Sequence, residues 1–397
     1  MSAARPTYAE LFLAALRLGC TSFGGPVAHL GYFHREYVEK RRWLDEEQYA
    51  DLVALCQFLP GPASSQVGFG LGYLKRGLTG GLLAWLGFTG PSAILMIGFA
   101  YGVTSLGQLG HVGWLRGLKV AAVAVVAQAV VAMWRSLCPD LRRSLVALVT
   151  AALLLLVPAA WSQVAVIVLG GLVGYFLLRE TGPVRRGLDS GGPALPLSSG
   201  LPWLAVFFVL LIALPVLTRF VHFDWLQVAD KFYRVGALVF GGGHVVLPLL
   251  EREVVAPGWL THDQFLAGYG AAQAVPGPLF TFAAYLGAVM RVGPGGWLGG
   301  SWALLCVFLP ALVIVLGALP YWQKLRSVPG ARAALSGANA AVVGALLAAL
   351  IDPVAITGLE TGWHAALAGG AFVVLLLTKT PAWLVVAASA LLGQWFF

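Results

Sequence analysis

The sequence predicts an all-α polytopic membrane protein made of two inverted repeats with broken or re-entrant helices. Hydrophobic residues make up 59% of the 397-residue chain and charged residues only 11%. Many separate apolar runs approach the roughly 20 helical residues that cross a bilayer. A fixed order of glycines, prolines and polar residues also occurs twice, which is typical of transporters whose site lies between duplicated halves.

The apolar segments are the expected helices. In chain order they cover residues 7–33, 50–74, 80–104, 115–135, 143–158, 161–178, 201–218, 226–250, 265–290, 295–319, 333–351, 364–378 and 381–397. A linker rich in Gly, Pro and Ser at 182–200 separates the halves. The predicted organisation is therefore an N-terminal repeat at 1–181, a linker plus an additional transmembrane helix at 182–218, and a C-terminal repeat at 219–397.

The repeat is visible residue by residue, because Arg17 corresponds to Arg234 and the order is kept from there. The first copy contains Arg17, Gly19, Phe23-Gly24-Gly25, Arg35-Glu36, Trp43-Leu44, Gln48, Gln57 and Pro60-Gly61-Pro62. The second contains Arg234, Gly236, Phe240-Gly241-Gly242, Arg252-Glu253, Trp259-Leu260, Gln264, Gln273 and Pro276-Gly277-Pro278. This correspondence indicates a duplicated structural unit.

The additional helix at 201–218 gives an odd number of crossings between the two copies, so the second copy should be inverted. The broken segments either span the membrane or enter and leave on one side. The re-entrant arrangement places more Lys and Arg residues on the N-terminal side and agrees better with the positive-inside rule. Both arrangements predict a cytoplasmic N terminus.

Four helix breaks are the first candidates for a binding site. They are Gly24-Gly25-Pro26, Pro60-Gly61-Pro62, Gly241-Gly242-Gly243 and Pro276-Gly277-Pro278. Irregular backbone at membrane depth is tolerated only inside protein or beside a cavity. A helix that restarts after a break presents free N–H groups and the positive end of its dipole, which suits an anion.

Glycine at these breaks would let a ligand approach the backbone closely. Ser64 and Ser65 follow the first Pro-Gly-Pro loop and Thr281 follows the second, so their hydroxyls can donate to oxygen atoms. The alternative is that the prolines and glycines only kink helices for packing.

Charged residues inside apolar runs are further candidates. Arg17 and Arg234 could supply positive charge for a dianion, or they could form ion pairs with Glu10 and Asp230 on their own helices. Lys119 and its equivalent, Asn339, could line a cavity. Alternatively, Lys119 extends toward the membrane surface.

Glu36 and Glu253 are the repeated acidic residues and the best candidates for proton coupling. A simple ion pair with the preceding arginine is the alternative. His29 and His244 follow the glycine breaks out of register, and buried histidines are more often satisfied polar residues than proton carriers.

Other functions have little support in the sequence. The four cysteines stand singly without metal-type spacing, and motifs for metalloproteases, P-loops or serine hydrolases are missing, so we expect neither cofactor nor catalysis. The net charge of +8 reflects membrane topology rather than nucleic-acid binding. The first apolar run carries Glu10 and Arg17, which argues against a cleavable signal peptide.

The first copy, with Phe23-Gly24-Gly25-Pro26, His29, Glu36, Trp43-Leu44 and Pro60-Gly61-Pro62, resembles the chromate ion transporter family. The second copy, from Phe240 to His244 and at 276–278, resembles the two-domain, long-chain form of that family. The second copy carries Gly243 where the first has Pro26, so the two halves need not contribute equally.

The resemblance implies a secondary active transporter that exports chromate or a sulfate-like oxyanion across the bacterial inner membrane. The membrane potential or a proton gradient would drive it, and it would confer chromate resistance. The expected partners are the oxyanion and the lipid bilayer, with a homodimer as a candidate assembly. Transport of another small anion, such as sulfate or a carboxylate, remains open, as does a membrane-embedded enzyme or lipid-handling protein.

Overall fold

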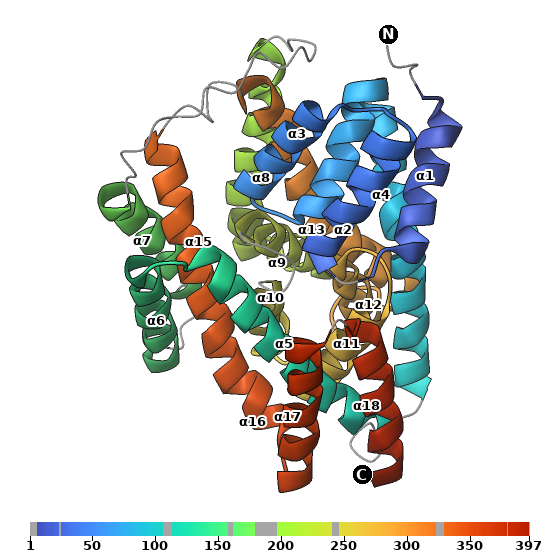
Figure 1. The fold of residues 1–397 in the computed structure, drawn as a ribbon, viewed down its shortest axis with the longest axis vertical. Coiled ribbons are helices and arrows are strands. Elements are labelled where there is room, and N and C mark those ends of the chain that lie inside the picture. The colour runs from blue at the N-terminus through green and yellow to red at the C-terminus, as the bar shows by residue number, and fades with distance from the viewer. Residues whose placement is uncertain are drawn as a thin grey trace.

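The computed structural model describes residues 6–23, 25–105, 113–157, 162–178, 197–239, 246–322, 329–378 and 380–396. All regular elements within these ranges are helices, which confirms the predicted all-α class (Figure 1). Five of the described helical stretches are long and apolar enough to cross a membrane. They are Ala63–Thr104, Arg116–Arg135, Leu197–Phe220, Gly296–Tyr321 and Ala333–Asp352.

The first repeat contains the helices α1 to α7. Their bounds are α1 Tyr8–Thr21, α2 Gly25–His34, η1 Arg35–Lys40, α3 Glu46–Phe58, α4 Ala63–Ser105, α5 Gly113–Leu137, α6 Leu141–Leu156 and α7 Ser162–Leu177. The additional helix α8 covers Leu201–Phe220 after the short turn η3 Leu197–Ser199.

The second repeat follows α8. Its elements are α9 Asp224–Leu238, α10 Val246–Val254, α11 His262–Ala274, η5 Leu279–Thr281, α12 Phe282–Val289, α13 Gly296–Ala318, η6 Leu319–Tyr321, α15 Pro329–Ala349, η7 Leu350–Ala355, α16 Ile356–Gly358, α17 Gly362–Leu377 and α18 Ala382–Phe396. Its longer helices have counterparts in the first repeat in the same chain order.

The predicted helix breaks produce helical hairpins. Helix α3 and the first part of α4 turn back at Pro60-Gly61-Pro62, because Leu52 lies against Gly70, and α4 bends at Arg76 and Gly77. In the second repeat, the Tyr285 hydroxyl donates to the Gln264 carbonyl at 2.8 Å. Helices α11 and α12 therefore form the matching hairpin, with Pro276-Gly277-Pro278 at its tip.

The helices of the two repeats run in opposite directions. The second part of α4 is antiparallel to its counterpart α13, because Tyr101 lies at Trp297 and Trp85 at Phe308. Figure 1 shows α5 rising toward α6, whereas its counterpart α15 descends toward α16. This is the arrangement that inverted repeats require.

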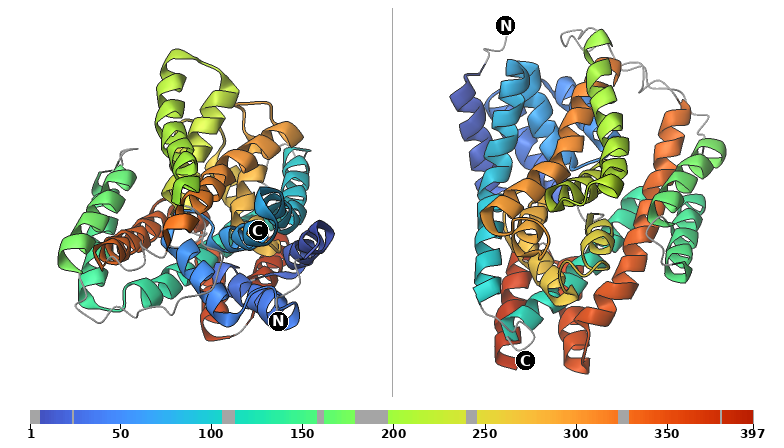
Figure 2. Two further views of the ribbon diagram at one scale, coloured as in Figure 1. Left: turned by 90° about the horizontal axis from the view of Figure 1, so that it is seen from above. Right: turned by 180° about the vertical axis from the view of Figure 1, so that it is seen from behind.

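The repeats also exchange packing partners. Helix α15 packs on α6 and α7 of the first repeat, and α5 packs on α17 and α18 of the second. Figure 2 shows the α6–α7 pair beside α15 in both views. Gly174 meets Gly337 and Gly117 meets Gly393 at these contacts, since small residues let membrane helices approach closely.

The hairpin tips join the two repeats through reciprocal backbone hydrogen bonds. The Gly61 N–H donates to the Val239 carbonyl at 2.7 Å, and the Gly277 N–H donates to the Ser22 carbonyl at 2.9 Å. Ser22 and Val239 hold the same position in the two repeats, directly before the Phe-Gly-Gly breaks. Proline has no N–H, so glycine carries the only backbone donor of each Pro-Gly-Pro loop.

Both loop glycines should resist substitution by alanine. Gly61 has φ +121° and Gly277 has φ +101°. A Cβ would lie 2.6 Å from the Cβ of Ala311 in the first loop and 2.8 Å from Oγ of Ser92 in the second. We expect Gly61→Ala and Gly277→Ala each to lower the free energy of unfolding by about 1–3 kcal/mol, measured by thermal or denaturant unfolding in detergent.

Gly98→Ala is the matched control, because a Cβ added at this residue would have no neighbouring atom within 4 Å and its φ is not positive. It should leave stability unchanged or raise it by up to about 1 kcal/mol. Equal stability of all three variants and the parent protein would contradict the strained, closely packed loops.

Candidate substrate site between the repeats

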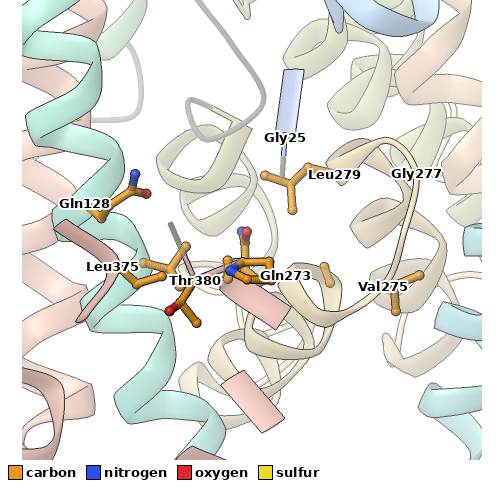
Figure 3. Close-up of a pocket in the computed structure, with 12 residues that line it drawn as sticks. Gly25, Gln128, Gln273, Val275, Gly277, Leu279, Leu375 and Thr380 are labelled. Atoms are coloured by element: carbon orange, nitrogen blue, oxygen red, sulfur yellow. The ribbon is translucent and has the colours of Figure 1, made fainter. Parts of the chain in front are cut away.

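A cavity of about 180 Å³ lies between the two repeats, where the first break of one meets the loop of the other (Figure 3). Its lining comes from α2 and α5 of the first repeat and from α11, the 275–279 loop and the α17–α18 connection of the second. The lining residues are Gly25, Val125, Gln128, Ala272, Gln273, Val275, Gly277, Leu279, Leu375, Thr380, Pro381 and Ala382.

Three neutral polar side chains supply the chemistry of this cavity. They are Gln128 on α5, Gln273 at the end of α11 and Thr380 between α17 and α18. Figure 3 shows Gln128 at the left, with Thr380 and Gln273 near the centre of the view. Among the described residues, the Nε2 atom of Gln273 is buried without a hydrogen-bond partner. The Gln273 side chain also interacts with the buried Tyr269 hydroxyl, so a bound ligand would compete with Tyr269 for this amide.

The backbone adds a favourable electrostatic field. Gly25 begins α2, so the positive end of that helix dipole adjoins the cavity. The described lining residues include no acidic or basic side chain. The cavity is comparable in volume to a cavity of roughly 150 Å³ that admits benzene. It therefore has room for one small polar ligand held by neutral side chains, and the N terminus of α2 favours an anion there.

The equivalent place in the other half has a different lining. Gln128 corresponds to Ala348 through the match of Gly117 with Gly337, and Gln57, the equivalent of Gln273, is exposed. The polar lining is therefore not duplicated among the described residues, although the backbone frame is.

The candidate glycines at the helix breaks lie in two different places. Gly25 and Gly277 both line the cavity, whereas Gly61 lies at the other tip, bonded to Val239. Gly24, Gly241 and Gly242 lie outside the described residues.

The predicted hydroxyl donors are all buried. Ser64 Oγ lies 3.3 Å from Nδ1 of His29, and Ser65 Oγ is buried without a partner among the described residues. Thr281 donates to the Pro278 carbonyl at 2.8 Å, which closes the turn after its loop.

The two predicted arginines do not line the cavity. Arg17 is on the exposed face of α1, while Glu10 bonds instead to the Thr7 amide at 2.6 Å as part of a helix cap. Arg234 pairs with Asp230 at 2.8 Å and lies 3.5 Å from Glu253. The alternative of an ion pair within α9 is thus the one observed for Arg234.

Lys119 bridges three elements away from the cavity. Its Nζ lies 2.9 Å from Asp263 on α11 and 3.1 Å from Glu360 before α17, and its side chain is 8% exposed. Its equivalent, Asn339 on α15, has a buried Oδ1 without a partner among the described residues.

The two repeated acids sit in equivalent arrangements of acid, cation and tryptophan. Glu36 pairs with Arg41 at 2.6 Å, and the guanidinium lies 4.8 Å from the ring centre of Trp43. Burial opposes ionisation of Glu36, but Arg41 and the nearby Lys40 outweigh it and lower the pKa of the carboxyl.

Glu253 pairs with Lys231 at 3.0 Å, and that ammonium lies 4.7 Å from the ring centre of Trp259. The observed partners therefore come from elsewhere in the chain, and not from the preceding Arg35 or Arg252. Arg252 donates instead to the Ser162 hydroxyl at 3.0 Å.

The sequence reasoning missed the side chains that make the cavity polar. Gln273 had a usable signal, because Gln57 and Gln273 recur four residues before each loop glycine. Gln128 and Thr380 had none, since they lie far from any repeated motif and reach the cavity only through the exchanged packing of α5, α17 and α18.

Comparison with known proteins agrees with this architecture. The sequence pattern that defines the chromate transporter family matches residues 9–175 and again residues 226–394. The two matches fall on the two repeats and leave out α8.

Curated relatives match most of the chain. A chromate transport protein of Pseudomonas aeruginosa is 29% identical over 98% of this chain and 93% of its own length. A chromate transport protein of Cupriavidus metallidurans is 28% identical over 87% and 83%. A probable chromate transport protein of Synechococcus elongatus is 29% identical over 85% and 82%.

No solved structure matches the chain. The family pattern covers both repeats, and the described helices include apolar spans in each half. The chain is a multi-pass membrane protein that belongs to the chromate transporter family.

Proposed function

We propose that this protein exports chromate, or a sulfate-like oxyanion, across the bacterial inner membrane by secondary active transport. The observation that carries the proposal is the cavity between inverted repeats, lined by amide and hydroxyl groups beside the N terminus of α2. The curated relatives named chromate transport proteins support the choice of oxyanion.

The cavity chemistry suits a tetrahedral dianion. The Gln273 and Gln128 amides and the Thr380 hydroxyl donate to its oxygens, while the α2 dipole offsets part of its charge. At Gly25 and Gly277 no side chain stands between the backbone and the ligand. We propose the same role for the other glycines of the helix breaks, Gly24, Gly241 and Gly242. These donors recognise shape and hydrogen-bonding oxygens, so they accept chromate and sulfate alike.

The membrane potential can supply the driving force. Each charge that crosses about 100 mV changes the free energy by about 2.3 kcal/mol. A dianion therefore leaves a negatively charged cytoplasm with about 4.6 kcal/mol of assistance at that potential. The proposed topology places the N terminus in the cytoplasm, with the hairpin tips meeting inside the membrane.

Uptake of chromate into everted membrane vesicles tests direction and driving force together. We expect energised vesicles to accumulate chromate, and sulfate to compete. Valinomycin with potassium removes the potential and nigericin removes the proton gradient, so the ionophore that stops uptake identifies the driving force. Uptake that neither ionophore reduces, or accumulation only in right-side-out vesicles, would contradict proton- or potential-driven export.

The pseudosymmetry supplies a matched pair of variants for the site itself. Gln273→Leu removes a donor from the cavity, whereas Gln57→Leu changes the equivalent exposed position. A hydrogen bond to a charged partner contributes about 1.5–3 kcal/mol. We therefore expect Gln273→Leu to weaken oxyanion binding about 10- to 100-fold, and Gln57→Leu to change it less than about twofold.

Equilibrium binding of sulfate or chromate to the purified protein measures both variants directly. Equal effects of the two substitutions would mean that the site is duplicated, and an unaffected Gln273→Leu protein would remove this cavity from the transport path.

A further inference from the structure

A buried polar pair lies one helical turn beyond the cavity. His29 is 1% exposed and Ser64 is 2% exposed, and Nδ1 of His29 lies 3.3 Å from Oγ of Ser64. His29 is four residues after Gly25 on α2. The two positions share a helix face, so the face that closes the cavity continues to this pair.

The pair retains hydrogen-bonding capacity. Among the described residues, Oγ of Ser65 and Nε2 of His29 are buried and make no hydrogen bond of standard distance and angle, although the imidazole also interacts with the backbone carbonyl of Ser22. When the Ser64 hydroxyl donates to Nδ1, the neutral imidazole carries its proton on Nε2 and presents it as a donor. Ser64 and Ser65 also lie in the first turn of α4, where the helix dipole favours an anion.

The second repeat keeps a buried hydroxyl at the position of Ser65, where Thr281 stands, but it shows that the fold does not need polar groups at the other two positions. The positions equivalent to His29 and Ser64 are Val246 and Phe280, and these are 0% and 1% exposed. The same helices thus close around an apolar pair in one half and a polar pair in the other. Buried polar groups in a membrane protein are costly and usually serve a function.

We propose that His29, Ser64 and Ser65 form a second oxyanion position on the transport path, beyond the cavity that Gln273 lines. This proposal rests on the proposed transport of an oxyanion and names further residues that contact it. The Nε2–H of neutral His29 and the Ser65 hydroxyl donate to the ligand, and Ser64 fixes the imidazole tautomer.

The test compares His29→Val, which installs the residue of the second repeat, with Val246→Ala as the matched control. Sulfate and chromate binding and chromate uptake are measured for both, with unfolding temperatures as a check on folding. We expect His29→Val to weaken binding or uptake at least 10-fold and Val246→Ala to change oxyanion affinity less than twofold. Should His29→Val fail to fold, His29→Gln and Ser65→Ala replace it, with a loss expected for Ser65→Ala.

Nitrogen NMR of histidine-labelled protein in nanodiscs gives a direct readout. Sulfate, but not the same concentration of chloride, should shift the Nε2 resonance of His29, which is assigned by its absence in His29→Gln. Normal binding and uptake by His29→Val, with no sulfate-dependent shift, would overturn the second position. If Gln273→Leu still loses binding, only this inference fails. If the parent protein binds no oxyanion, the proposed function fails with it.

Discussion

One pair of backbone hydrogen bonds organises the centre of this protein. Each Pro-Gly-Pro loop has a single N–H, and each N–H is bonded to the residue before the Phe-Gly-Gly break of the other repeat. The bond brings the end of one hairpin against the broken helix of the opposite half. The positive φ of the glycine and the tight contacts at Ala311 and Ser92 follow from that approach.

As a consequence, the backbone around the centre is symmetric between the two repeats, whereas the side chains that line the cavity are not. The backbone contacts at Gly61 and Gly277 are equivalent, whereas Gln128 corresponds to Ala348, and His29 to Val246, across the pseudosymmetry. The proposed polar route would therefore use only one half of the duplicated scaffold. The equivalent apolar region of the other half then contributes only packing, which keeps the number of unsatisfied polar groups in the membrane low.

The backbone arrangement of the two repeats could be predicted from the sequence, but only some of the residues that line the cavity could. The repeated glycine and proline breaks predicted hairpins as one of two arrangements, and the additional helix at 201–218 predicted the inversion. The i, i+4 spacing gave the pair between Asp230 and Arg234 as one of two alternatives for Arg234. The ion pair of Lys231 with Glu253 was not predictable, because Arg41 takes the equivalent role from another place in the chain. Likewise, His34 pairs with Glu46 while Glu251 pairs with His262, so the two repeats exchange the acid and the base at equivalent positions. Side-chain partners can be swapped between elements while the geometry stays the same, and one sequence does not reveal which swap has occurred.

Amide hydrogen exchange at the two loops tests the central claim most directly, because each loop holds only one exchangeable backbone proton. The account predicts slow exchange at both Gly61 and Gly277 in the free protein. It also predicts that sulfate or chromate adds protection at Gly277, which lines the cavity, and little at Gly61. Rapid exchange at both glycines, or equal added protection at both, would contradict a frame closed by reciprocal bonds with one polar site.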